Sequence, residues 1–247
     1  MKRDALVTII TVCYNSEKTI RKTMESVLEQ TYTNIEYIII DGKSLDTTME
    51  IVEEFSPLFG ERIKIISEPD NGIYDAMNKG IKLAKGELIG IINSDDFYEK
   101  DAVEKIVNSW NGKPGQILHG LMRQVKNGKE YGVILTTCDF LYEKMIQHPT
   151  CFVTKDVYEK VGLFDTQYCC VADMDFMIRA YESGMVNFRP VYHVITNFCE
   201  GGMSDSAIGK MEKIKYLKKH GKISWLSYII MSIFIPLKSK VYKKIWN

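Results

Sequence analysis

The first hundred residues alternate between continuous apolar runs and segments in which apolar residues recur at helical spacing. The apolar runs are rich in β-branched residues and cover residues 5–13, 35–40, 63–66 and 88–92. Such runs predict strands that are buried on both faces. Apolar spacing of three and four predicts helices between them, at residues 17–29, 47–55 and 74–84. This alternation predicts an α/β fold with a mostly parallel, doubly wound sheet and right-handed crossovers.

The regular alternation stops after residue 100. The pattern there predicts a helix at 101–110, a β-hairpin at 117–125 and 129–135, a strand at 147–153, and helices at 155–161 and from residue 171. Asn127 and Gly128 favour the tight turn that the hairpin needs. We therefore expect an antiparallel, acceptor-side extension. The predicted domain at 1–209 then has one half at 1–100 and another at 101–209.

Polar residues follow each of the first four predicted strands. They are Tyr14 and Asn15, then Asp41, then Asp70 and Asn71, and finally Asn93, Ser94, Asp95 and Asp96. The carboxyl ends of parallel strands meet at one edge of a sheet, where such sheets bind ligands. We therefore expect these side chains to gather around one binding site.

The adjacent carboxylates Asp95 and Asp96 end an apolar strand and admit two interpretations. Two neighbouring acids repel each other unless a cation joins them, and Mg²⁺ or Mn²⁺ carrying substrate phosphates prefers oxygen ligands of this kind. Alternatively, one acid caps the following helix by accepting a backbone N–H.

Asp173 and Asp175 lie in the first turn of the helix expected from residue 171. Acids in a first turn are stabilised by the helix dipole, which is one sufficient reason for their presence. The competing interpretation is a general base, which must stay ionised near the group that it deprotonates.

The charge of the chain is uneven although its formal net charge is zero. Residues 210–247 hold ten lysines and one glutamate, and they form a basic tail beside an acidic remainder. This distribution gives no general affinity for nucleic acid. The six cysteines show neither a CxxC pair nor a zinc spacing, which favours reduced thiols in the cytoplasm. The first apolar run lacks a signal-peptide cleavage pattern and is interpreted as a strand.

Within this tail, residues 223–237 are strongly apolar and are flanked by lysines. Crossing a bilayer takes about 20 residues, so this run is short for a membrane span. An interfacial anchor at the inner face of the plasma membrane fits better, with Trp225, Tyr228 and Trp246 at headgroup level. The alternative is a core helix or a dimer-forming helix.

Five segments, taken in order, resemble the inverting family 2 glycosyltransferases. They are residues 11–15 (TVCYN), 41–47 (DGKSLDT), 70–80 (DNGIYDAMNKG), 93–96 (NSDD) and 172–173 (AD). The resemblance covers residues 5–205 and implies the GT-A fold, a nucleotide-binding α/β domain fused to an acceptor-binding half. It also implies a nucleotide diphosphate sugar, expected to be a UDP-sugar, as the donor.

The resemblance assigns most candidate residues to the donor. Val12, Tyr14 and Asn15 would line the nucleotide pocket, and Asp41 would accept a hydrogen bond from the ring N–H of the base. The donor site would further include Asp70, Asn71, Asn93 and Ser94. Asn78 and Lys79 would lie toward the phosphates or the sugar; the alternative is that Lys79 is a solvated helix residue.

Two positions depart from the family pattern. Asn93 replaces the first acid of the Asp-x-Asp metal motif, so that Mg²⁺ or Mn²⁺ would be held chiefly through Asp95, helped by Asp96 and the diphosphate. Ala172 replaces the glutamate before the catalytic acid. Asp173 would still deprotonate the acceptor hydroxyl, and one displacement would invert the anomeric carbon.

His148 and a loop at residues 200–204 also resemble family positions. We thus expect transfer of a sugar to a glycan or lipid-linked acceptor in polysaccharide biosynthesis. A non-catalytic nucleotide-sugar-binding or scaffold protein is the alternative that the two departures suggest. A dinucleotide-dependent dehydrogenase is disfavoured because no GxGxxG follows the first strand.

Overall fold

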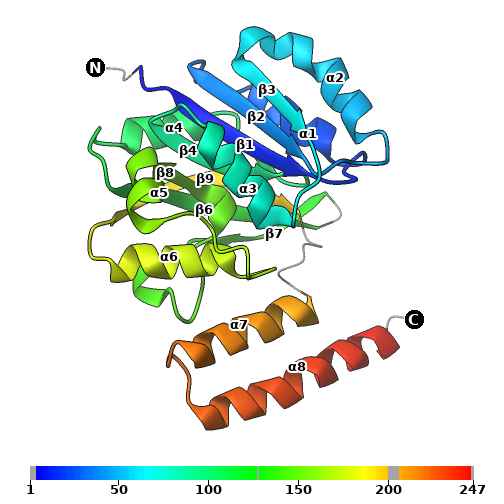
Figure 1. The fold of residues 1–247 in the computed structure, drawn as a ribbon, viewed down its shortest axis with the longest axis vertical. Helices are drawn as coiled ribbons and strands as arrows, with labels where there is room; N and C mark the ends of the chain where they lie inside the picture. Colours follow the sequence, from blue (N-terminus) through cyan, green and yellow to red (C-terminus); the bar gives the residue numbers. More distant parts are fainter. Residues whose placement is uncertain (1–3, 127, 200–205, 246–247) are drawn as a thin grey trace.

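The computed structural model describes residues 4–126, 128–199 and 206–245, with side chains up to residue 235. Within these residues, nine strands form a single sheet with helices on both faces, and a pair of helices lies below it (Figure 1). The strand order is β3-β2-β1-β4-β8-β6-β9-β5, with β7 paired to β6. The mixed sheet with an antiparallel extension agrees with the predicted fold class.

The first four long strands form the parallel half of the sheet. They are β1 (Val7–Cys13), β2 (Ile35–Asp41), β3 (Ile63–Ser67) and β4 (Leu88–Asn93). Neighbouring strands among these four pair in parallel, so that their carboxyl ends share one edge. Their continuous apolar sequences have the expected cause, since both faces of this half are covered by helices.

Two apolar cores lie on the two faces of the sheet. On one face are α1 (Ile20–Leu28), α2 (Thr48–Phe59) with the short η1 (Gly60–Arg62), and α4 (Ala102–Ser109). On the other face are α3 (Ile73–Leu83), α5 (Lys155–Val161) and α6 (Ala172–Glu182). The helix α3 packs on this face, and its N-terminal residues Ile73 and Ala76 reach the carboxyl edge of the parallel strands.

The second half of the chain extends the sheet beyond β4. It contains β6 (Gln116–Lys126), β7 (Lys129–Ile134), η2 (Cys138–Phe140), η3 (His148–Thr150) and β8 (Cys151–Thr154). The predicted hairpin is confirmed as the antiparallel pair β6–β7. The strand expected at 147–153 instead begins with the η3 turn, and only its second part pairs with β4 and β6.

Two strands are not expected from the sequence. β9 (Asn187–Cys199) pairs in parallel with β6, and the short β5 (Phe97–Tyr98) pairs with β9. The capping interpretation of Asp95 and Asp96 is wrong, because the chain runs from them into β5. The next helix, α4, begins only at Ala102 and has Asp101 at its N-cap position.

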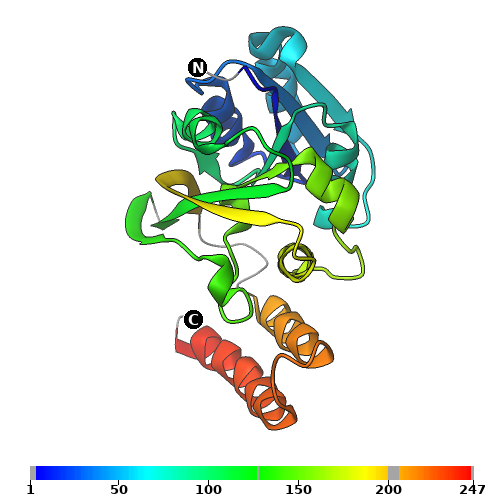
Figure 2. The same cartoon turned by 90° about the vertical axis from the view of Figure 1, so that its left-hand side faces the viewer.

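The C-terminal helices α7 (Ala207–Lys219) and α8 (Trp225–Ile245) form an antiparallel hairpin. α7 lies beside α6, and α8 lies on the side of α7 that faces away from the sheet (Figure 2). Tyr216 and Leu217 of α7 share an apolar cluster with Met174 and Ile178 of α6. Across the described residues, no helix combines the length and apolar character that a membrane crossing requires.

Candidate active site

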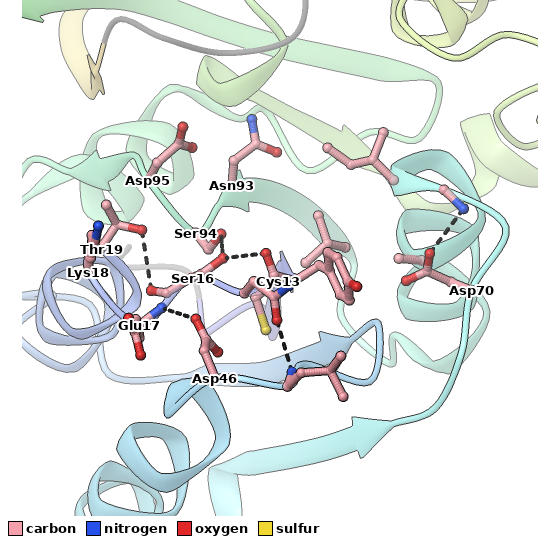
Figure 3. A pocket seen from close by; sticks show the side chains of 17 residues that line it. Cys13, Ser16, Glu17, Lys18, Thr19, Asp46, Asp70, Asn93, Ser94 and Asp95 are labelled. Atoms are coloured by element: carbon pink, nitrogen blue, oxygen red, sulfur yellow. Dashed lines mark hydrogen bonds between the residues drawn. The ribbon is translucent and has the colours of Figure 1, made fainter.

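A cavity of about 990 Å³ opens at the carboxyl edge of the parallel strands. The loops that follow β1, β2, β3 and β4 all contribute to its wall, as Figure 3 shows. The lining residues predicted from the sequence are Val12, Tyr14, Asn15, Asp70, Asn93, Ser94 and Asp95. These seven come from three separate loops, so the expected gathering at one sheet edge is present.

Side-chain hydrogen bonds tie the loops together at the cavity rim. The Asn15 side-chain oxygen accepts from the Leu45 N–H at 2.9 Å, and the Asn15 N–H donates to the Ser44 hydroxyl at 2.9 Å. The hydroxyls of Ser16 and Ser94 lie 2.8 Å apart and join the loops after β1 and β4. Asn15 has a φ of 48°, a left-handed conformation that asparagine tolerates better than most residues. These bonds hold the rim in one arrangement.

Asp41 lies beneath the cavity and is fully buried. Its carboxylate accepts hydrogen bonds from the N–H and hydroxyl of Ser44 and from the Ser67 hydroxyl at 2.6 Å. The Cys13 thiol lies 3.8 Å from the same carboxylate; burial first, and then the charge of Asp41, raise the pKa of this thiol. Asp41 thus binds the ends of three strands together. The structure places it outside the cavity lining, where the expected contact with a base would require these serines to move.

The lining of the cavity is predominantly acidic. Four acids, Glu17, Asp46, Asp70 and Asp95, face one lysine, Lys18, among the lining residues. Free diphosphate groups would be repelled by such a surface, because like charges in a partly desolvated cleft interact strongly. A diphosphate can bind there if a divalent cation accompanies it.

Asp95 differs from the other three acids in having no partner. Asp46 accepts from the Glu17 N–H at 3.2 Å, and Asp70 accepts from the Gly72 N–H at 3.0 Å. Within the described part of the chain, no other residue hydrogen bonds or pairs with the Asp95 carboxylate, and no dashed line reaches it in Figure 3. Burial raises the pKa of Asp95. An unpartnered, partly buried acid at a cavity wall is suited to take a cation.

Asp96 occupies a different environment from Asp95. It is fully buried and does not line the cavity. One carboxylate oxygen accepts the N–H of Cys199 at 3.0 Å, and the backbone carbonyl accepts the Thr23 hydroxyl at 2.6 Å. Burial, followed by the charge of Asp95, raises the pKa of Asp96 well above its usual value. The structure therefore places this expected metal ligand behind the wall, where it anchors the end of β9.

The donor residues expected on α3 also point elsewhere. The buried Asn78 amide donates to the Phe164 carbonyl at 2.9 Å and accepts the Phe164 N–H at 3.0 Å. Lys79 donates to the Pro69 carbonyl at 2.8 Å and pairs with Glu68 at 3.0 Å. Neither these two residues nor Asn71 is part of the cavity lining. Asn78 instead connects α3 to the loop before α6 by hydrogen bonds, and Lys79 binds the loop after β3.

Asp173 is half-buried in the first turn of α6. Its Oδ1 accepts the Tyr74 hydroxyl at 2.9 Å and the Met174 N–H at 2.9 Å. Tyr74 follows Ile73, which lines the cavity, so α3 connects the catalytic candidate to the cavity wall. His148 is buried against Phe164, with ring centroids 5.5 Å apart. Burial lowers the pKa of His148, and the charge of Asp173 opposes that shift.

Several lining residues are not singled out by the sequence pattern. That pattern places Glu17, Lys18 and Thr19 in the first helix, but α1 begins at Ile20 and leaves these three residues in the loop that lines the cavity. Asp46 lies within the segment 41–47, where the resemblance gives it no role. The loop expected at residues 200–204 lies outside the described residues.

A divalent cation fits the residues present only if the donor supplies further ligands. In the described ranges, no three His, Cys, Asp or Glu side chains gather closely enough to hold a metal ion. Side-chain oxygens are nevertheless available, since Asp95 is unpartnered. The buried Asn93 Oδ1 and Asp96 Oδ2 also have no hydrogen-bond partner among the described atoms. Mg²⁺ and Mn²⁺ commonly use one or two protein oxygens together with substrate phosphates and water.

Comparison with known families decides the class of the protein. The model of the family described as glycosyl transferase family 2 matches residues 8–174, from the first strand to just past Asp173. The chain belongs to glycosyl transferase family 2. It is therefore a glycosyltransferase, and the matched segment contains both the cavity and the α6 acid.

Relatives and solved structures agree with this assignment. A PGL/p-HBAD biosynthesis glycosyltransferase of Mycobacterium bovis is 28% identical over 209 residues, 83% of this chain and 81% of that protein. An uncharacterized glycosyltransferase of Mycobacterium tuberculosis is 34% identical over 70% of this chain and 68% of its own length. Among structures, S. aureus TarS 1–349 with UDP-GlcNAc has a TM-score of 0.70 at 19% identity, covering 92% of this chain and 70% of that one. This chain covers only 40% of the length of the chain in a longer TarS structure. These structural likenesses establish the GT-A fold.

Asn78 gives a direct test of the site as described. We expect Asn78→Ala to lower the free energy of unfolding by about 2–4 kcal/mol, because it leaves the buried Phe164 N–H and carbonyl unpaired. Urea unfolding measures this loss. We expect the thermal shift caused by UDP with Mn²⁺ to stay as in the wild type, since Asn78 does not line the cavity. The control is Lys79→Gln, which removes two partly exposed ion pairs, with Glu68 and Asp75, and should cost about 1 kcal/mol or less. Normal stability with lost UDP binding in Asn78→Ala would contradict this placement.

Proposed function

We propose that this glycosyltransferase moves a sugar, with inversion, from a nucleotide diphosphate sugar to a glycan or lipid-linked acceptor. The observation that carries the proposal is the cavity at the strand ends, with unpartnered Asp95 in its wall and α3 leading from it to Asp173. A volume of about 990 Å³ accommodates a ligand of the size of a nucleotide sugar. The solved complex of S. aureus TarS with UDP-GlcNAc supports a UDP-sugar as donor.

The charge of the cavity supports a divalent cation at the donor. The structure of the mannosyltransferase PcManGT from Pyrobaculum calidifontis is of a complex with GDP-Man and Mn²⁺, and its TM-score to this chain is 0.61 at 18% identity. In this chain Asp95 would hold Mg²⁺ or Mn²⁺, and the Asn93 amide oxygen would add a neutral ligand. The bound cation supplies charge stabilisation to the departing diphosphate.

Asp173 is the proposed base of the transfer. Its carboxylate takes the proton of the acceptor hydroxyl while the oxygen forms a bond to the anomeric carbon from the face opposite the diphosphate. The bond between that carbon and the diphosphate oxygen breaks, and its electron pair stays on the diphosphate. Tyr74 donates its hydroxyl to Asp173 at 2.9 Å and so fixes the orientation of the carboxylate. One displacement inverts the anomeric configuration.

The acceptor is proposed to be a lipid-linked or surface glycan. The relative of Mycobacterium bovis is named for PGL/p-HBAD biosynthesis, and a relative in Bacillus subtilis is named as a putative glycosyltransferase, EpsH. A pathway that builds glycans on lipid carriers would place this protein at the cytoplasmic face of a membrane.

The C-terminal helix α8 offers a surface for such a location. Its exposed apolar face carries Trp225, Leu226, Ile230, Ile233 and Phe234, which are between 46% and 65% exposed. Exposed apolar residues on a single helix, next to a lysine-rich sequence, are typical of helices that lie in the interface of an anionic membrane. We propose that α8 makes this peripheral contact, with anionic lipid as its partner.

The donor and the cation are tested together. We expect UDP-GlcNAc with Mn²⁺ to raise the melting temperature by about 5–10 °C at a hundred times its Kd, because ligand binding to the folded state adds about 2.7 kcal/mol. Without the metal, the shift should be much smaller, since the acidic cavity repels the diphosphate. Asp95→Asn should remove the metal-dependent part of the shift. The control Asp101→Asn, at a half-exposed residue that pairs with Lys105 and does not line the cavity, should retain it. An unchanged metal response in Asp95→Asn would refute its role as ligand.

Asp173→Asn tests the base and, with it, the alternative of a non-catalytic protein. We expect transfer to fall at least a hundredfold, because a general base contributes about 10² to 10⁴ in rate. The metal-dependent thermal shift should persist, since Asp173 does not line the donor cavity. Product NMR on the wild type should show inversion. Turnover near the wild-type rate would exclude Asp173 as the base, and absence of turnover in the wild type with every donor that binds would favour the non-catalytic protein.

The lipid contact is tested by making the face of α8 polar. We expect the wild-type protein to sediment with vesicles containing anionic phosphatidylglycerol, and Leu226→Ser/Ile233→Ser to lose this binding because two apolar anchors are removed. The control Tyr192→Ser replaces an equally exposed apolar residue on β9. The lipid contact would be contradicted if the wild-type protein did not sediment with the vesicles. It would also be contradicted if the protein formed a dimer that the same double substitution dissociates.

A further inference from the structure

The chain enters α6 without the usual side-chain cap. The N-cap residue Val171 provides no side-chain hydrogen bond to the first turn. The backbone just before it is held from outside: the N–H groups of Cys169 and Cys170 donate to the two carboxylate oxygens of Glu212 at 2.9 and 2.6 Å. Glu212 belongs to α7, more than forty residues along the chain. One carboxylate thus fixes two consecutive peptide groups at the approach to the helix that carries Asp173.

A second bond from α7 reaches the first turn of α6 itself. The buried Tyr216 hydroxyl donates to Asp175 Oδ1 at 3.1 Å. The other Asp175 oxygen accepts from Arg179 Nε at 2.7 Å. Arg179 in turn donates to the carbonyls of Val161 and Leu163 at 2.6 and 2.7 Å. This network connects α7 through α6 to the loop after α5.

Apolar contacts close the interface between the two helices. Met174 and Ile178 of α6 pack with Tyr216 and Leu217 of α7 and are almost fully buried there. The Tyr168 ring packs edge-on against Tyr216, with centroids 5.4 Å apart. The apolar contacts and the hydrogen bonds lie on the same side of α6, and together they fix the position of α7 against it.

Asp173 lies between these two points of attachment, three residues after Cys170 and two before Asp175. We propose that Glu212, supported by Tyr216, is a positioning residue for Asp173, so that the C-terminal hairpin completes the catalytic half of the site. The inference rests on the proposed function of Asp173 as base. Misplacing a reacting group by about 1 Å costs about a hundredfold in rate. The contacts of Glu212 and Tyr216, which we call the α7 clamp, hold the backbone that sets the position of Asp173.

The test compares Glu212→Gln and Tyr216→Phe with the wild-type protein. Glutamine keeps the size of Glu212, but it offers one acceptor oxygen and turns a donor toward the second N–H. The matched control is Glu159→Gln, which changes an exposed glutamate on α5. Each protein is assayed for release of nucleotide from UDP-GlcNAc and, in parallel, from GDP-Man, with Mn²⁺ present and water as acceptor.

We expect both variants to lower kcat at least about tenfold while the donor KM and the metal-dependent thermal shift stay unchanged. Amide exchange at residues 169–175 should rise in Glu212→Gln. A role confined to general stability would instead lower donor binding and kcat together. A wild-type kcat in both variants, or a parallel loss of donor binding, would overturn the inference.

Asp173→Asn in the same assay separates the two proposals. If that variant is inactive while Glu212→Gln and Tyr216→Phe are fully active, only the positioning role fails. If Asp173→Asn itself has wild-type activity, Asp173 is not the base, and the α7 clamp then has no catalytic acid to position.

Discussion

The register of the parallel strands is the constraint on which the rest of the site depends. Val12 pairs with both Ile40 and Asn93, and one residue further along the sheet Asp41 pairs with Cys13 and Ser67. Four loops therefore leave the sheet at the same level. Asp41 then holds three of these strand ends by accepting hydrogen bonds from Ser44 and Ser67 and by its contact with Cys13. A shift of one residue in β2 would turn this buried acid toward the opposite face and break its contacts with Cys13 and Ser67.

The two halves of the molecule divide the chemistry. The parallel half supplies a rigid, acidic cavity whose only unpartnered acid among its lining residues is Asp95. The extended half supplies α6 and, through Tyr74, its contact with α3. The Asn78 amide ties the same two parts together at Phe164. The cavity and the proposed base are thus connected by α3, a helix that contacts both.

The sequence predicted the parallel half well because its signals are local. Continuous apolar strands and polar residues after them indicate the sheet, its edge and six of the lining residues, and the family resemblance adds Val12. The sequence ranked Asp95 above Asp96 as the metal ligand, but it could not show that Asp96 is buried, because that burial depends on the contact with the end of β9. β9 itself was missed, since Arg189, Pro190 and His193 interrupt its apolar pattern and its pairing with β6 is irregular. The directions of Asn78 and Lys79 could not be predicted either, because each side chain binds a residue outside α3. These partners are Phe164 for Asn78 and Glu68 for Lys79.

The position of the cation tests the central claim most directly. In a crystal of the protein with UDP and Mn²⁺, the anomalous scattering of manganese locates the ion. The account predicts a peak at coordination distance, about 2.0–2.6 Å, from an oxygen of Asp95 and next to the diphosphate in the cavity at the strand ends. An ion bound by Asp96 with Asp95 turned away, or a diphosphate bound outside this cavity, would contradict it.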